Sequence, residues 1–255
     1  MIIIKTEKEI ELLRVAGKHL AQALKEVEQM VAPGVSTYEL DMCAREAIKK
    51  LGDEPAFLDY QPEGARYPYP AALCASVNDE VVHGIPKKDV ILKEGDVISI
   101  DLGLIHKGVI ADHAITVPVG NVSKEVKDLL RITKESLDVG IGAIMPGAHV
   151  GDIGYAIESY IKPHGYGIVR ELAGHGVGRE IHEDPYVPNY GTKGTGALLK
   201  PGMVIAIEPM INLGGRGVIF EKDGYTVRTK DGLPSAHFEH TVLITEKGAE
   251  VLTKR

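Results

Sequence analysis

The spacing of apolar residues predicts a pair of helices in the first half of the chain. Residues 10–20 carry apolar side chains at intervals of three and four, which is the period of an amphipathic helix. Thr6 followed by Glu9 has the S/T-x-x-E pattern of a capping box, and Ser36 followed by Glu39 repeats it. Because a Pro-Gly pair separates the two stretches, we expect two helices joined by a short turn.

The second half of the chain repeats this plan. Ser123 precedes another run of apolar residues at helical spacing, and a second Pro-Gly pair stands at 146–147. Ile153, Ile157 and Ile161 then mark one face of a fourth helix. The chain therefore reads as two similar halves, each of which opens with two helices.

A strand-like segment that ends in an acid also occurs twice. LKEGDVISID, which ends at Asp101, matches LKPGMVIAIE, which ends at Glu208. A later acid followed by histidine occurs in each half as well, at Asp112 and Glu239. Because chance rarely preserves both a strand and its acid within one chain, we interpret these positions as four carboxylates that converge on one point.

These patterns predict one catalytic domain over residues 1–255, built from pseudo-symmetric halves of about 5–120 and 121–250. No linker rich in Ser or Pro separates the halves. Helices beside hairpin strands are typical of an α+β fold with a mainly antiparallel sheet. The fold class expected from the pattern is therefore α+β with internal twofold pseudo-symmetry.

Composition narrows the function classes. The apolar content is 44%, the formal net charge is −7, and basic residues come as isolated pairs, so we expect no nucleic-acid surface. No apolar run approaches the ~20 residues of a membrane span, and the N-terminus lacks a signal-peptide pattern. The two cysteines, Cys43 and Cys74, are expected to be reduced thiols in a cytoplasmic protein.

Clustered acids repel one another, and that repulsion indicates bound cations. A short turn at His106-Lys107 would pair Asp101 directly opposite Asp112, with the two Cβ atoms about 4.5–5.5 Å apart. On its own, either residue is more typical of a solvent-facing strand position. The matching acids of the second half, Glu208 and Glu239, favour the interpretation that Asp101 and Asp112 are metal ligands.

Histidines supply the nitrogen donors. His175 lies in AGHGVG, where three glycines permit close backbone approach, although a tight turn with an incidental histidine remains an alternative. His83 and His182 are candidates for contacting a carbonyl or amide, and on these residues alone a structural role is equally compatible. We expect the other histidines to be structural or at the surface, namely His19, His106, His113, His149, His164, His237 and His240.

Several motifs together resemble type I methionine aminopeptidases over essentially the whole chain. They are NDEVVHGIP at 78–86, Asp101 followed eleven residues later by Asp112, GHGVGREIHEDP at 174–185, IEP at 207–209 and FEHT at 238–241. The resemblance implies the pita-bread fold, with a curved antiparallel sheet and two pairs of helices. It also implies the removal of N-terminal methionine by hydrolysis at a dinuclear metal centre.

The same resemblance implies roles for individual residues. The metal ligands would be Asp101, Asp112, His175, Glu208 and Glu239, with Asp112 and Glu239 bridging two divalent ions, which could be Co, Mn, Fe or Zn. His83 and His182 would be catalytic and contact the substrate, and Glu208 would also shuttle a proton. The pocket for the first side chain would be lined by Tyr69, Cys74, Ile181 and Tyr225. A monovalent cation would bind near Asn78 and Ser235.

Partners and alternatives follow from this resemblance. The expected substrates are nascent polypeptides that begin with methionine, with transient ribosome contact and a monomeric enzyme. Two alternatives stay open at this point: a proline-directed relative such as aminopeptidase P or prolidase, and a pita-bread binding module without catalysis. The former usually adds an N-terminal domain, and the latter loses metal ligands, whereas all five ligand positions are filled here.

Overall fold

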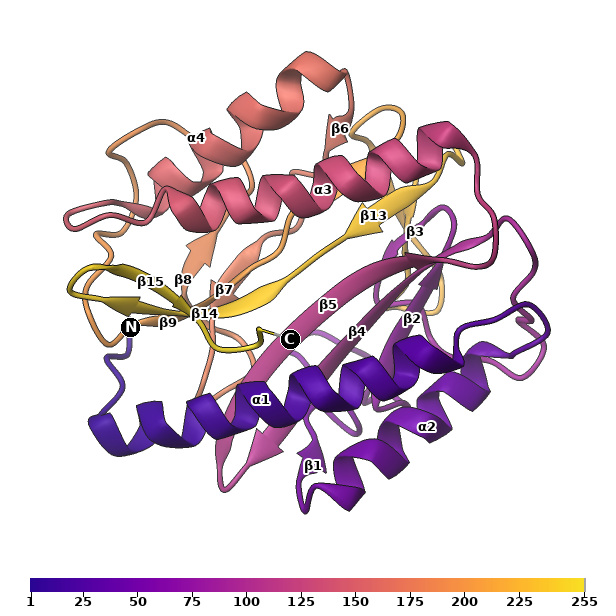
Figure 1. The fold of residues 1–255 in the computed structure, drawn as a ribbon, viewed down its shortest axis with the longest axis horizontal. Coiled ribbons are helices and arrows are strands. Elements are labelled where there is room, and N and C mark those ends of the chain that lie inside the picture. Colours follow the sequence, from indigo (N-terminus) through magenta and orange to yellow (C-terminus); the bar gives the residue numbers. More distant parts are fainter. Residues whose placement is uncertain (255) are drawn as a thin grey trace.

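The computed structural model describes residues 1–254, and Figure 1 shows their arrangement. Four α-helices lie in two pairs, with most of the strands between the pairs. The helices are α1 (Glu7–Met30), α2 (Thr37–Lys50), α3 (Lys124–Gly142) and α4 (Val150–Ile161), and a 3₁₀ turn, η1 (Lys162–His164), follows α4. The predicted repeat of two helices per half is therefore confirmed.

The predicted capping boxes set the starts of α1 and α2. The amide of Thr6 donates to Glu9 Oε2 at 2.7 Å, and the amide of Glu9 donates back to Thr6 Oγ1 at 3.3 Å. Ser36 and Glu39 make the same reciprocal pair at 2.8 and 3.2 Å. Because each box satisfies amides that the first turn leaves free, the sequence fixes where these helices begin.

Antiparallel pairing joins the strands, as expected. The first-half strands are β1 (Glu54–Pro55), β2 (Leu73–Val77), β3 (Glu80–Val82), β4 (Val97–His106) and β5 (Val109–Pro118). The second-half strands are β6 (Gly167–Ile168), β7 (Gly174–Gly176), β8 (Glu183–Val187), β9 (Val204–Ile207), β10 (Met210–Asn212), β11 (Val218–Phe220), β12 (Val227–Thr229), β13 (Ser235–His237), β14 (His240–Thr245) and β15 (Gly248–Val251). They form four small sheets in the described chain, with every pairing antiparallel.

The β4–β5 hairpin corrects one sequence expectation. The turn residues are Lys107 and Gly108, both with positive φ, so His106 faces Val109. Asp101 therefore lies opposite Ala114 rather than opposite Asp112. The register differs by two residues from the expected one, and a shift of two keeps side chains on the same face. The two acids are diagonal neighbours on one face of the hairpin.

Side-chain hydrogen bonds join the two halves along β5. Thr241 Oγ1 accepts from the Asp112 amide at 2.9 Å and donates to the Asp112 carbonyl at 2.7 Å. Thr116 makes the same double contact with the backbone of His237, at 2.7 Å in each direction. The amide of Glu239 donates to a carbonyl of β5 at 2.9 Å. This seam places β5 beside the segment that carries Glu239.

The helices cover the apolar side of the strands. α1 packs on β4 and β5, and α3 packs on α4, β10 and β13. The main core includes Leu13 and Leu20 of α1, Ile100 of β4 and Ile157 of α4, all fully buried. Within residues 1–254, none of the helices combines the length and apolar character needed to cross a bilayer. Packing on the outer side leaves the opposite faces of β4 and β5 to carry polar side chains.

Candidate metal centre

Four acids and one histidine meet where the two halves join. Asp101 lies on β4, Asp112 on β5 and His175 on β7, whereas Glu208 directly follows β9 and Glu239 directly precedes β14. All five line one cavity of about 350 Å³. The sequence repeat thus predicted that the four acids come together, and the AGHGVG motif separately pointed to His175.

Short distances connect these groups. His175 Nε2 lies 3.5 Å from Glu208 Oε1 and 3.9 Å from Asp112 Oδ2. Ligand atoms of Asp112, His175 and Glu239 all lie within 4.8 Å of one another. Donor atoms this close together would hold a divalent ion, for which oxygen and nitrogen are suitable ligands.

The carboxyl groups are buried and incompletely satisfied. Asp101, Asp112 and Glu239 are 8, 4 and 2% exposed. One oxygen of each, Asp101 Oδ1, Asp112 Oδ1 and Glu239 Oε1, has no hydrogen-bond partner. Buried carboxylate oxygens without donors are costly, so each needs a proton or a cation.

Burial and mutual repulsion shift the acid pKa values upward. Burial, reinforced by Glu208, raises the pKa of Asp112 to about 8, and burial raises the pKa of Glu208 to about 8 as well. Burial and then the neighbouring Asp112 hold the pKa of Asp101 and of Glu239 well above the usual carboxyl range. Clustered acids whose pKa values are raised in this way are typical of a site that binds cations.

The hydrogen bond at His175 sets the tautomer that a ligand requires. His175 Nδ1 lies 2.9 Å from the carbonyl oxygen of Gly176, which can only accept, so Nδ1 carries the hydrogen. Nε2, which faces the acids, then keeps its lone pair. Burial, with His182 nearby, lowers the pKa of His175 to about 3, so the ring is neutral. The donor set of oxygens and one neutral imidazole fits borderline divalent ions.

The other two predicted histidines border the same cavity. His83 follows β3 with φ of 58°, and burial lowers its pKa to about 4. His182 precedes β8, and its ring centroid lies 4.5 Å from that of His175 in an edge-to-face contact. Both histidines therefore lie where they can contact a molecule bound in the cavity beside the acid cluster.

Two further residues of the site were not expected from the sequence. His237 is 2% exposed, its two ring nitrogens lack hydrogen-bond partners, and its Nε2 lies 3.4 Å from Glu208 Oε2. Tyr60 places its hydroxyl 3.0 Å from His182 Nδ1. His237 stands two residues before Glu239, and side chains two apart in an expected strand share a face. That spacing could have placed His237 at the site. We found no comparable sequence signal for Tyr60.

The cavity has an apolar end beside the acids. Tyr69, Cys74 and Tyr225 line it, and the rings of Tyr69 and Tyr225 meet edge to face at 5.1 Å. Cys74 is a buried free thiol, as expected. Ile181 is 2% exposed and packs in the same apolar cluster as Tyr69 and Cys74, with Tyr225 against it, so its place in the pocket stays a prediction.

Asn78 and Ser235, which the sequence suggested as the site of a monovalent cation, both use their side chains in hydrogen bonds within the protein. Asn78 Oδ1 accepts from the Val97 amide at 3.0 Å, and its Nδ2 donates to Asp96. Ser235 Oγ lies 2.9 Å from Asn212 Oδ1. The Ser235 amide donates to the Asn78 carbonyl at 2.9 Å, which brings the two residues together.

Comparison with known proteins identifies the family. The model of metallopeptidase family M24 matches residues 11–246. The chain belongs to metallopeptidase family M24. Among its relatives, the methionine aminopeptidase of Aquifex aeolicus is 49% identical over 98% of this chain and 97% of that protein. Methionine aminopeptidase 1 of Bacillus subtilis is 47% identical over the full length of both.

Solved structures of similar proteins confirm the fold. The methionine aminopeptidase from Thermotoga maritima has a TM-score of 0.96 and 46% identity, with both chains fully covered. The prolidase from Pyrococcus furiosus has a TM-score of 0.79 and 28% identity, and the match covers 99% of this chain but 66% of that one. The predicted α+β pita-bread fold is therefore confirmed.

Proposed function

We propose that this M24 chain is a metal-dependent aminopeptidase that removes the N-terminal methionine from nascent proteins and peptides. One observation carries the proposal: a small apolar cavity, lined by Tyr69, Cys74 and Tyr225, ends at a cluster of four acids and one histidine. The two relatives reported above, from Aquifex aeolicus and Bacillus subtilis, are both named as methionine aminopeptidases. A neutral side chain in this cavity brings the adjoining peptide bond to the acid cluster.

The acid cluster is proposed to hold two divalent ions, which could be Co, Mn, Fe or Zn. Asp101, Asp112, His175, Glu208 and Glu239 would be the ligands, because all five line the same cavity. Such ions polarise a carbonyl group and lower the pKa of water toward neutrality. The unsatisfied oxygens and the repulsion among the acids support this assignment.

His182 is proposed to polarise the substrate carbonyl. In the proposed arrangement the Tyr60 hydroxyl donates to His182 Nδ1, which lies 3.0 Å away, so the hydrogen of the neutral ring would be on Nε2. That tautomer can donate to a carbonyl oxygen and stabilise negative charge there as the bond is broken. Tyr60 therefore acts as a positioning residue for His182.

His83 and Glu208 are proposed to handle the amine side of the reaction. His83 is neutral because burial lowers its pKa to about 4, so it can contact the scissile amide or the leaving amine. Glu208 faces the cavity and His237, and it would pass a proton to the leaving amine. Both residues also border a second, wider cavity of about 660 Å³, where the remainder of a peptide can lie.

Methionine suits the apolar end of the site. Its unbranched thioether adapts to irregular cavities and contacts aromatic rings favourably. The two tyrosines and the Cys74 thiol supply such a lining.

The remaining assignments belong to this proposal. A monovalent cation near Asn78 and Ser235 would rely on backbone carbonyls, since both side chains already make internal hydrogen bonds. We further propose a cytoplasmic monomer that meets nascent chains, with transient contact to the ribosome.

The test is mass spectrometry of short peptides incubated with metal-depleted protein plus each divalent ion in turn. Met-Ala-Ser should lose its methionine, whereas Xaa-Pro peptides should stay intact; the opposite preference would favour a proline-directed enzyme. Glu208→Gln should abolish turnover, and the exposed control Glu246→Gln should not. Undiminished turnover by Glu208→Gln would remove that residue from the mechanism, and binding without cleavage by the unaltered chain would indicate a binding module.

A further inference from the structure

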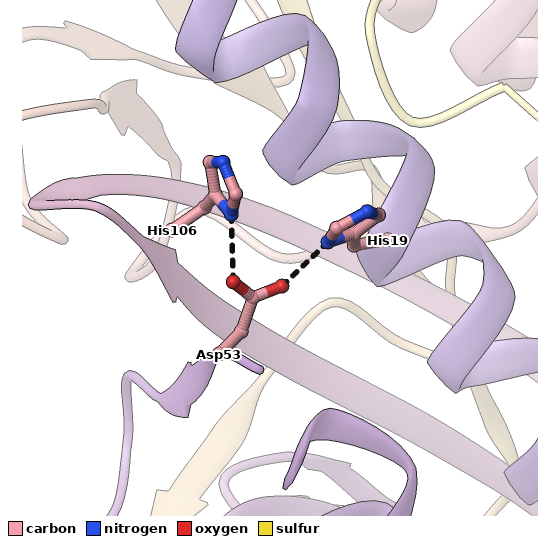
Figure 2. Close-up of side chains that lie close together, drawn as sticks. All are labelled: His19, Asp53 and His106. Carbon is pink, nitrogen blue, oxygen red and sulfur yellow. Dashed lines mark hydrogen bonds and ion pairs between the residues drawn. The ribbon is translucent and has the colours of Figure 1, made fainter. Parts of the chain in front are cut away.

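A second cluster of metal-ligand side chains lies outside the candidate metal centre. Figure 2 shows His19 of α1, Asp53 of the α2–β1 connection and His106 at the end of β4 pointing toward one another. None of them lines the cavity that holds the four acids. The three come from separate parts of the chain, so only the fold brings them together.

The two imidazoles aim the same ring nitrogen at one carboxylate. His19 Nδ1 lies 2.7 Å from Asp53 Oδ2, and His106 Nδ1 lies 2.7 Å from Asp53 Oδ1. The rings are nearly perpendicular, at 84°, with centroids 5.3 Å apart, so the nitrogens approach from two directions (Figure 2). One donor atom from each residue lies within 4.8 Å of the other two.

The burial of the cluster leaves one open side. The side chains of Asp53 and His106 are 2 and 9% exposed, whereas that of His19 is 28% exposed. In the part of the chain that the structure describes, Asp53 has no ion pair with a lysine or arginine. A carboxylate this deeply buried needs a compensating charge, and a cation held between Asp53 and the two imidazoles would supply one. The partly exposed side of His19 gives such an ion a way in.

We propose that His19, Asp53 and His106 form a second divalent-metal site, selective for zinc-like ions and separate from the dinuclear centre. Two histidines and a carboxylate are a recognised zinc donor set, and water can complete the coordination on the open side. Binding requires each neutral ring to carry its hydrogen on Nε2, so that Nδ1 offers a lone pair. The ion would fasten α1 and the α2–β1 connection to the β4–β5 hairpin, which carries Asp101 and Asp112.

Zinc stoichiometry tests the proposal without reference to catalysis. The unaltered protein, Asp53→Asn and the control His164→Gln, an exposed histidine elsewhere, are dialysed against the same free Zn²⁺ and analysed for metal. Because all three keep the acid cluster, the site predicts one zinc fewer per chain in Asp53→Asn alone. Equal zinc content in all three proteins would overturn it.

A second variant separates a metal site from a purely hydrogen-bonded cluster. In His19→Asn, the amide can still donate to Asp53, but it is a poor zinc ligand. The proposal predicts that Zn²⁺, added after the acid cluster is saturated, raises the Tm of the unaltered protein but not of His19→Asn. It also predicts that ¹⁵N spectra show His19 and His106 changing from the Nδ1–H to the Nε2–H form. Equal Tm increases, or rings that keep Nδ1–H in zinc, would contradict the proposal.

Discussion

Adding divalent metal to the metal-depleted protein is expected to release protons. The acid cluster holds protons in the absence of metal because burial and repulsion raise its pKa values, to about 8 for Asp112 and for Glu208. Carboxylates must be ionised to act as ligands. Filling the centre near neutral pH therefore expels the protons that the acids had retained.

The size of the release follows from these values. A carboxyl group with a pKa of about 8 is about nine-tenths protonated at pH 7, so Asp112 and Glu208 together release about two protons per chain. At pH 9 the same two groups would release only about 0.2. Asp101 and Glu239, whose pKa values are also raised, can add to the total.

Calorimetry measures this quantity directly. Mn²⁺ is titrated into depleted protein at pH 7 in two buffers with different ionisation enthalpies, and the difference in heat gives the number of protons released. A heat that does not depend on the buffer would show that the acids are already ionised, and it would refute the reasoning. Glu239→Gln, which removes one acid without changing its shape, serves as the comparison and should release fewer protons.

The same shifts determine how the depleted protein responds to pH. A carboxyl whose folded pKa lies above its unfolded value binds its proton more tightly when folded, so its contribution to stability is largest at low pH. That contribution declines as pH rises from about 4 toward about 8. Across this range the free energy of unfolding of the depleted protein should fall relative to that of the metal-loaded protein, and equal slopes in chemical denaturation would contradict the sign.

Three substitutions test packing and positioning elsewhere. Gly17→Ala gains up to ~1 kcal/mol of helix propensity, but the added Cβ would lie 2.3 Å from the Leu252 carbonyl oxygen. We therefore expect a lower Tm, and a higher Tm would show that the contact relaxes freely. Tyr69→Phe removes a hydroxyl that lies 3.0 and 3.2 Å from two buried carbonyls, and it should cost about 1–2 kcal/mol in urea unfolding, which an unchanged midpoint would contradict. Tyr60→Phe should lower kcat/KM about fivefold by removing the hydrogen bond to His182, with an unchanged Tm, and unaltered kinetics would rule out the positioning role.

The sequence was informative where local chemistry determines structure. The capping boxes at Thr6 and Ser36 located two helix starts, because the pattern itself makes the bonds that begin a helix. The repeated acids located the site, since equivalent positions in two pseudo-symmetric halves face a common junction. Neither inference required knowledge of contacts distant in the chain.

Other features depend on geometry that a sequence does not specify. The hairpin turn moved by one residue from its expected place, which displaced the partner of Asp101 by two positions. His237 reaches Glu208 because the seam fixes its backbone against Thr116.

The most direct test of the central claim is anomalous X-ray scattering from crystals saturated with Mn²⁺. The account predicts two manganese ions at the junction of the halves, contacted by Asp101, Asp112, His175, Glu208 and Glu239, with Asp112 and Glu239 touching both. A junction without anomalous density at saturating Mn²⁺ would contradict it.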